Sequence, residues 1–187
     1  MQSTKETPSA GRIALRDISL IAMFAAVIAV CSWISIPLAV PLTMQTFAVF
    51  LAGLMLGPRR AVAAVGVYIL LGAAGLPVFA GFNAGAGVLL GSTGGYIIGF
   101  VFTALLSGAA GSRFSGSGWK MMLLMLLGLL ICYAFGTAWF IVVYARQSGP
   151  VGVTTALAWC VFPYIVPDIL KMLLAVTVMR RFRLYKA

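Results

Sequence analysis

The sequence predicts an all-α integral membrane protein with six transmembrane helices. Of its 187 residues, 63% are hydrophobic and only 9% are charged, and the mean hydropathy is +1.11. A soluble domain carries about a quarter charged residues, so this chain has too few charges to coat a soluble globule. Its apolar stretches are long and unbroken, which favours helices over a membrane barrel, whose strands alternate apolar and polar residues.

Uncharged stretches set the number of spans. Residues 18–58 and 61–112 contain no Asp, Glu, Lys or Arg. Because one span needs about 20 residues, each stretch is long enough for two. The further apolar stretches 121–144 and 156–179 bring the predicted total to six. Residues 1–16 are then a polar cytoplasmic tail, and residues 17–187 a single transmembrane domain.

The basic residues indicate the orientation. If the N-terminus is cytoplasmic, eleven of the thirteen lie on the inner side, whereas the outer loops carry only Arg146. This asymmetry follows the positive-inside rule and places both termini in the cytoplasm. It also explains the formal charge of +10 without a nucleic-acid partner. The inner residues are Lys5, Arg12, Arg16, Arg59, Arg60, Arg113, Lys120, Arg180, Arg181, Arg183 and Lys186.

The first span combines a basic flank with a face of small residues. We interpret it as a retained helix and not as a signal peptide, because five more spans follow it. Ala22 and Ala26 lie one turn apart, and such a small-xxx-small pattern lets another helix approach closely. Two interpretations stay open at this point: packing inside this bundle, and docking of another membrane subunit.

The connection between the first two spans, Ile36–Thr46, is apolar and contains two prolines that disfavour a helix. One interpretation is a lid that brings Thr43, Gln45 and Thr46 near a cavity. The other is an ordinary turn in which Thr43 caps the second helix.

Residues 72–99 contain nine glycines in 28 positions, which allows tight turns and a close approach of the backbone to a ligand. No Gly-Lys-Ser/Thr follows, so this is not a phosphate loop. The chain has no histidine, no carboxylate pair and no cluster of metal ligands, so we predict neither an enzyme nor a metal or cofactor site. Cys31, Cys132 and Cys160 are far apart and are expected to be free buried thiols.

Asp168 is the one acidic residue predicted to lie within the membrane. Counting back from Arg180 at about 1.5 Å per residue places it about 18 Å inside a core about 30 Å thick. Lys171 follows three residues later on the same helical face. A charge at this depth is costly, so the pair should face the interior or a cavity. Pro163 and Pro167 precede it and are expected to break the helix there.

The Asp168–Lys171 pair again leaves two interpretations. It is either a structural ion pair or a polar anchor for a small ligand, in which the carboxylate accepts N–H bonds and the ammonium meets a carbonyl or carboxylate.

Five motifs follow one another along the chain. They are Val-Pro-Leu-Thr-Met-Gln-Thr at 40–46, Leu-Gly-Pro at 56–58, Leu-Leu-Gly-Ala-Ala-Gly-Leu-Pro-Val-Phe at 70–79, Gly-Ser-Thr-Gly-Gly-Tyr at 91–96 and Pro-Asp-Ile-Leu-Lys at 167–171. Together they resemble the BioY family, the biotin-specific S-components of energy-coupling factor (ECF) transporters. The resemblance extends from about Ser19 onward. Ser92 departs from it, since the family usually has proline there.

This resemblance implies an S-component-like bundle with a ligand cavity near the outer face, closed by the first outer loop. It implies a biotin-binding subunit in the inner membrane of a bacterium, which captures biotin outside and delivers it inward with a transmembrane T-component and cytoplasmic ATPase subunits. The alternatives are a stand-alone secondary transporter or channel for a small solute, and a membrane scaffolding protein. The implied ligand-binding residues are Asp168, Lys171, Thr93 and Tyr96, with Gln45 and Asn83 as weaker candidates, and the implied docking residues are Ala22 and Ala26.

Overall fold

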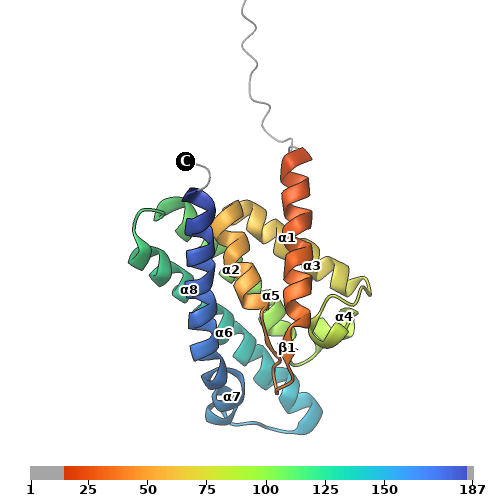
Figure 1. Ribbon diagram of the computed structural model, residues 1–187. Helices are drawn as coiled ribbons and strands as arrows, with labels where there is room; N and C mark the ends of the chain where they lie inside the picture. The colour runs from red at the N-terminus through yellow and green to blue at the C-terminus, as the bar shows by residue number, and fades with distance from the viewer. Residues whose placement is uncertain (1–14, 185–187) are drawn as a thin grey trace, which may run out of the picture.

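The structure, a computed structural model, describes residues 15–184, and this part of the chain is almost wholly helical (Figure 1). Most of the predicted tail, with Lys5 and Arg12, lies outside the described residues, as does Lys186. The long helices are α1 (Leu15–Trp33), α2 (Gln45–Leu56), α3 (Pro58–Ala73), α5 (Gly94–Arg113), α6 (Gly118–Ser148) and α8 (Phe162–Leu184). The short elements are β1 (Ser35–Ile36), β2 (Leu42–Thr43), the 3₁₀ turn η1 (Ala80–Phe82), α4 (Ala86–Leu90) and α7 (Val153–Cys160).

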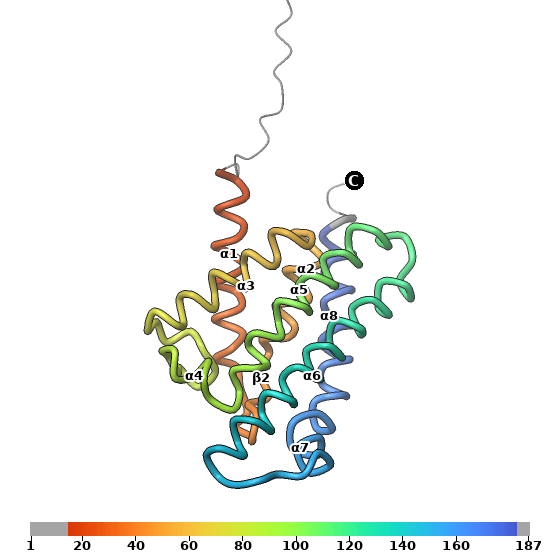
Figure 2. The backbone as a smooth tube through the Cα atoms, turned by 180° about the vertical axis from the view of Figure 1, so that it is seen from behind, coloured from red at the N-terminus to blue at the C-terminus, as the bar shows by residue number. Residues whose placement is uncertain are grey.

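The bundle has two chemically different ends. Helix α1 begins and α8 ends at one end, and the β1–β2 hairpin and α7 lie at the opposite end (Figures 1 and 2). The first end, called the basic end here, also carries the start of α3 with Arg59 and Arg60 and the start of α6 with Lys120. Arg146 lies in the last turn of α6, at the opposite or hairpin end.

Four helical segments of the described chain are long and apolar enough to cross a membrane: α1, α5, α6 and the α7–α8 segment Val153–Phe182. Helices α2 and α3 have only 12 and 16 residues, fewer than the roughly 20 needed for a simple span. Helix α2 packs against α1, α3, α5 and α8, so it is shielded from lipid by its neighbours. The count of six spans therefore stays a prediction.

Helix α2 and the start of α3 cross α5 without room for side chains. A Cβ atom added at Gly53 would lie 2.5 Å from Cβ of Ser107, and one added at Gly108 would lie 2.5 Å from Cα of Pro58. Such distances are shorter than any real van der Waals contact, so the backbones meet directly. This crossing fills the middle of the bundle toward the basic end.

The segment after α1 folds back on itself as a small antiparallel hairpin, with Ser35 paired to Thr43. Its tip is held down because the Tyr164 hydroxyl donates to the Val40 carbonyl, and Val40 is buried. The Thr43 hydroxyl accepts a hydrogen bond from the Gln45 N–H at 3.2 Å, so it also supports the start of α2. The expectation that Thr43 caps α2 is wrong, because Met44 is the N-cap residue and makes no side-chain cap hydrogen bond. The role of the loop as a lid stays a prediction.

The last span is interrupted between α7 and α8, at Val161. Pro163 lies in the first turn of α8, where a missing N–H costs nothing, and the expected break beside it is confirmed. At Pro167 the expectation is wrong, because α8 continues through this residue. Pro167 lies close enough to the start of α8 that little of the hydrogen-bond ladder is lost.

Candidate functional site

Near the hairpin end, two adjoining cavities of about 90 and 40 Å³ form one chamber. We call the first the amide lobe, because Gln45 and Asn83 line it, and the second the ionic lobe, because Asp168 and Lys171 line it. Five residues line both lobes, so the two cavities adjoin each other. These shared residues are Val40, Pro41, Thr43, Tyr96 and Phe100.

The ionic lobe is built around the Asp168 carboxylate, which is 2% exposed. Its Oδ1 accepts hydrogen bonds from Lys171 Nζ and from the Thr46 hydroxyl, both at 2.8 Å. Its Oδ2 accepts one from the Tyr133 hydroxyl at 2.5 Å. A buried carboxylate is tolerated only when it is paired and hydrogen-bonded in this way. Three helices, α2, α6 and α8, therefore meet at this one side chain.

Lys171 is buried as well, and it keeps bonding capacity for a ligand. Its ammonium lies 2.8 Å from Asp168 Oδ1 and donates to the Thr46 hydroxyl at 3.1 Å. An ammonium has three donors, and these contacts within the described residues use two. A carboxylate has about four acceptor positions, of which the three donors above occupy three. The pair can thus offer one donor and one acceptor, side by side, to a molecule in the chamber.

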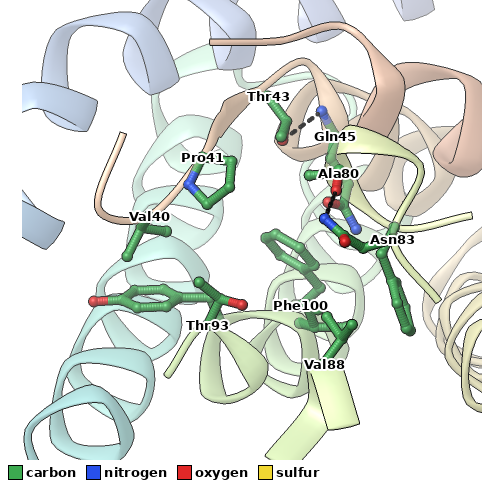
Figure 3. A pocket seen from close by; sticks show the side chains of 12 residues that line it. Val40, Pro41, Thr43, Gln45, Ala80, Asn83, Val88, Thr93 and Phe100 are labelled. Carbon is green, nitrogen blue, oxygen red and sulfur yellow. Dashed lines mark hydrogen bonds between the residues drawn. The ribbon is translucent and has the colours of Figure 1, made fainter. Parts of the chain in front are cut away.

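The amide lobe contains a buried donor without a partner. Gln45 is 3% exposed, and its Nε2 has no hydrogen-bond partner among the described residues. Leaving such a group unpaired costs about 1–3 kcal/mol, which a ligand acceptor would recover. Asn83 Nδ2 donates instead to the Ala80 carbonyl at 2.7 Å. Figure 3 shows the hairpin residues Val40 and Pro41 across this lobe from Ala80 and Asn83.

Tyr96 lines both lobes, and its position depends on a glycine. The ring packs directly on Gly136 of α6, where an added Cβ would overlap it, and its hydroxyl lies 2.8 Å from the Thr137 hydroxyl. On the next turn of α6, Trp139 Nε1 donates to the Gly91 carbonyl at 2.9 Å. Helix α6 thereby fixes the glycine-rich segment that carries Thr93.

The end of α1 holds the segment that leads into the amide lobe. The Ser32 hydroxyl donates to the Val78 carbonyl at 2.5 Å, and Trp33 Nε1 donates to the Pro77 carbonyl at 2.9 Å. The Trp33 ring also stacks on Phe82, with 5.0 Å between centroids. Residues 77–83 are thus tied to α1 as well as to the helix before them.

The chamber brings together all six predicted ligand-binding residues. Asp168 and Lys171 line the ionic lobe, Gln45, Asn83 and Thr93 the amide lobe, and Tyr96 both. Their role as ligand contacts stays a prediction. Tyr133 could not be predicted as part of the site, because a single tyrosine in an apolar helix has no spacing signal that links it to Asp168. Ala22 and Ala26 lie away from the chamber and are exposed on α1, so they do not pack inside this bundle.

The three cysteines are free, and two of them, Cys132 and Cys160, are buried in the wall of the ionic lobe. Cys31 is half-buried on α1. Within residues 15–184, no three His, Cys, Asp or Glu side chains gather as a metal site would require.

The sequence model of the BioY family matches residues 2–187, nearly the whole chain. The chain belongs to the BioY family. The resemblance drawn from the five motifs is thereby confirmed.

Named BioY relatives match over almost their full length. The probable biotin transporter BioY of Pyrococcus horikoshii is 41% identical, over 90% of this chain and 96% of the relative. The biotin transporter BioY of Thermotoga maritima is 36% identical, over the same shares. These relatives are named as transporters, and together with the apolar helices they indicate a multi-pass membrane protein.

A solved structure shows the same architecture. It is the crystal structure of the S-component for biotin from an ECF-type ABC transporter, with a TM-score of 0.80 and 28% identity. The match covers 92% of this chain and 95% of the other. The expected S-component-like fold is therefore confirmed.

Proposed function

We propose that this BioY protein is the membrane-embedded biotin-binding subunit of an ECF-type vitamin importer. The observation that carries the proposal is the chamber itself, in which the buried Asp168–Lys171 pair and the unpaired Gln45 amide face one space. The names of the relatives point to biotin as the ligand.

The two lobes suit the two ends of biotin. A ureido group presents N–H donors beside a carbonyl acceptor, which matches the acceptor and donor that Asp168 and Lys171 offer side by side. The valerate carboxylate only accepts hydrogen bonds, and the amide lobe supplies the free donor of Gln45. Phe100 and Tyr96, which line both lobes, would pack on the apolar ring and chain between these ends.

The hairpin acts as the lid of the chamber in this proposal. The two cavities are smaller than the roughly 300–1,000 Å³ of sites for drug-sized ligands, so the chamber must widen to admit a vitamin. Val40, Pro41 and Thr43 line both lobes, and the hydrogen bond from Tyr164 to Val40 is the tertiary contact that would open. The hairpin and its hydrogen bond to Tyr164 both lie at the hairpin end.

The proposal includes a topology. Residues 17–187 form a single domain with six spans, residues 1–16 a cytoplasmic tail, and both termini face the cytoplasm across the inner membrane of a bacterium. The gathering of basic side chains at one end supports this orientation. The hairpin end then faces outward, where biotin is captured.

Energy for uptake would come from partners. The exposed face of α1 with Ala22 and Ala26 docks a transmembrane T-component, which links the subunit to cytoplasmic ATPases. Small residues on an exposed helix face support this docking, since they allow a neighbouring helix to approach closely.

Calorimetry of the purified protein tests the ligand. We expect stoichiometric binding of biotin and none of thiamine or riboflavin, because only biotin carries a ureido ring and an aliphatic carboxylate together. Equal binding of all three vitamins, or none at all, would contradict the proposal. Biotin uptake that persists with inactive ATPases would instead favour the stand-alone transporter.

An Ala26→Leu variant tests the docking face. We expect biotin affinity within about twofold of wild type and at least a tenfold loss of uptake and of co-purified T-component, because the larger side chain holds the partner helix away. Ala134→Leu, an equally conservative change at an exposed alanine of α6, is the matched control and should leave both intact. Normal uptake by both variants would argue against docking at this face.

A further inference from the structure

A second recess of the molecule lies outside the chamber, between α6 and α8. Helix α6 packs on α5 and α7, and α8 on α2 and α7, so a groove is left along their facing surfaces. Its volume is about 330 Å³. The groove is lined by Trp119, Met122, Leu123 and Leu126 of α6 and by Ile169 and Met172 of α8.

The lining is apolar from floor to rim. Met172 is buried at the floor, whereas Leu123 and Trp119 on the rim are 53% and 65% exposed. Docking faces for transmembrane helices are rich in small residues, because backbones must approach. This groove has none and is instead bordered by large, flexible side chains. Such a surface suits a thin hydrocarbon chain better than a helix.

Two cations lie next to Trp119, at the basic end of the groove. The Arg180 guanidinium lies against the start of α6, so close that a Cβ added at Gly118 would touch its Nη2. Lys120 follows Trp119, and both are exposed. The two ion pairs of the described chain are Arg60–Asp17 and Lys171–Asp168, so neither Arg180 nor Lys120 has a carboxylate partner there.

We propose that this groove binds one anionic membrane phospholipid. Its acyl chain lies along the six apolar side chains, and its phosphate is held by Arg180 and Lys120. Trp119 stands between these parts, where an indole is favoured at the boundary of hydrocarbon and headgroup. A basic recess between transmembrane helices on the cytoplasmic side is the arrangement that selects anionic headgroups.

The site adjoins the ligand chamber without sharing a lining residue with it. Leu126 lines the groove and Leu129, one turn later, the ionic lobe; Met172 lines the groove and its neighbour Lys171 the ionic lobe. A bound lipid therefore braces α8, which carries the pair, against α6, which carries Tyr133. The proposal does not depend on biotin being the ligand.

Native mass spectrometry of the delipidated full-length chain tests it, with phosphatidylglycerol and phosphatidylcholine titrated separately. We expect one phosphatidylglycerol to bind at least tenfold more tightly than phosphatidylcholine. The double variant Lys120→Gln/Arg180→Gln should lose at least tenfold in affinity for phosphatidylglycerol, and Leu126→Trp, which fills the groove, should weaken both lipids. Arg59→Gln removes an exposed cation at the same end but on α3, and should change neither.

Three results would overturn the proposal. The first is equal affinity for the two lipids. The second is an equal loss in Arg59→Gln, which would indicate attraction by the whole basic end. The third is unchanged binding in Leu126→Trp together with competition by inorganic phosphate, which would indicate a headgroup site without an acyl groove. Thermal melting of each variant verifies that the fold is intact.

Discussion

An Asp168→Asn variant is expected to bind biotin at least ~30-fold more weakly than wild type, a loss of ~2 kcal/mol or more. Three donors converge on this carboxylate, from Lys171, Thr46 and Tyr133. An amide replaces one accepting oxygen by a donating NH₂ group and leaves the buried ammonium without a counter-charge. The acceptor that the pair would offer to the ligand is lost in the same step.

Lys171→Ala should cause a loss of similar size, because it strands the carboxylate. The measurement is calorimetry with biotin, accompanied by thermal melting without ligand to separate binding from folding. Asp17→Asn is the matched control. It makes the same chemical change in a half-exposed ion pair, in which Asp17 Oδ1 lies 3.0 Å from Arg60 Nη2. Such pairs contribute about 0–1 kcal/mol, so biotin affinity should be unchanged. Wild-type affinity in both Asp168→Asn and Lys171→Ala would make the pair purely structural.

The second large effect is expected at the crossing of α3 and α5. Gly108→Ala should destabilise the protein by ~1–3 kcal/mol or more, because the new methyl group would meet the backbone of Gly57 and Pro58. Backbone atoms cannot rotate aside as a side chain can, so the helices themselves must separate. The measurement is the melting temperature or the free energy of unfolding of the protein in detergent.

Gly66→Ala provides the comparison for this prediction. Gly66 lies inside α3, and a Cβ added there has no neighbour within 4 Å. In this variant the methyl group should be neutral, or should stabilise the helix by up to about 1 kcal/mol. If the two variants have the same melting temperature, the close approach of α5 to α3 would not be a determinant of stability.

The membrane helices could be predicted because the bilayer constrains them directly. The stretch 121–144, for example, lies within α6, which is long and apolar enough to cross a membrane, whereas of the two spans expected in 61–112 only α5 has that length. The hairpin around Val40 could not be predicted, since its two-residue strands have no periodicity, and its position depends on a contact with Tyr164, 124 residues away in the chain. The 12-residue helix α2 also escapes a length rule, because neighbouring helices surround it.

The residues of the candidate site likewise differ in whether they could be predicted from the sequence. Asp168 and Lys171 could be found because a charge inside an apolar stretch demands an explanation, and their spacing of three places them on one face. Tyr133 and the unpaired Nε2 of Gln45 can be recognised as site residues only in the folded protein. Packing brings their helices, α6 and α2, to the same carboxylate. Likewise, the pattern of Ala22 and Ala26 could not tell an inward face from an outward one.

Two close contacts limit the route that a solute could take through this protein. They join Gly53 to Ser107 and Gly108 to Pro58. Because these backbones touch, they leave no room for a solute between α5 and the segment formed by α2 and the start of α3. Biotin held in the chamber, as proposed, would therefore have to cross by another route, through separation of other helices or reorientation of the whole subunit.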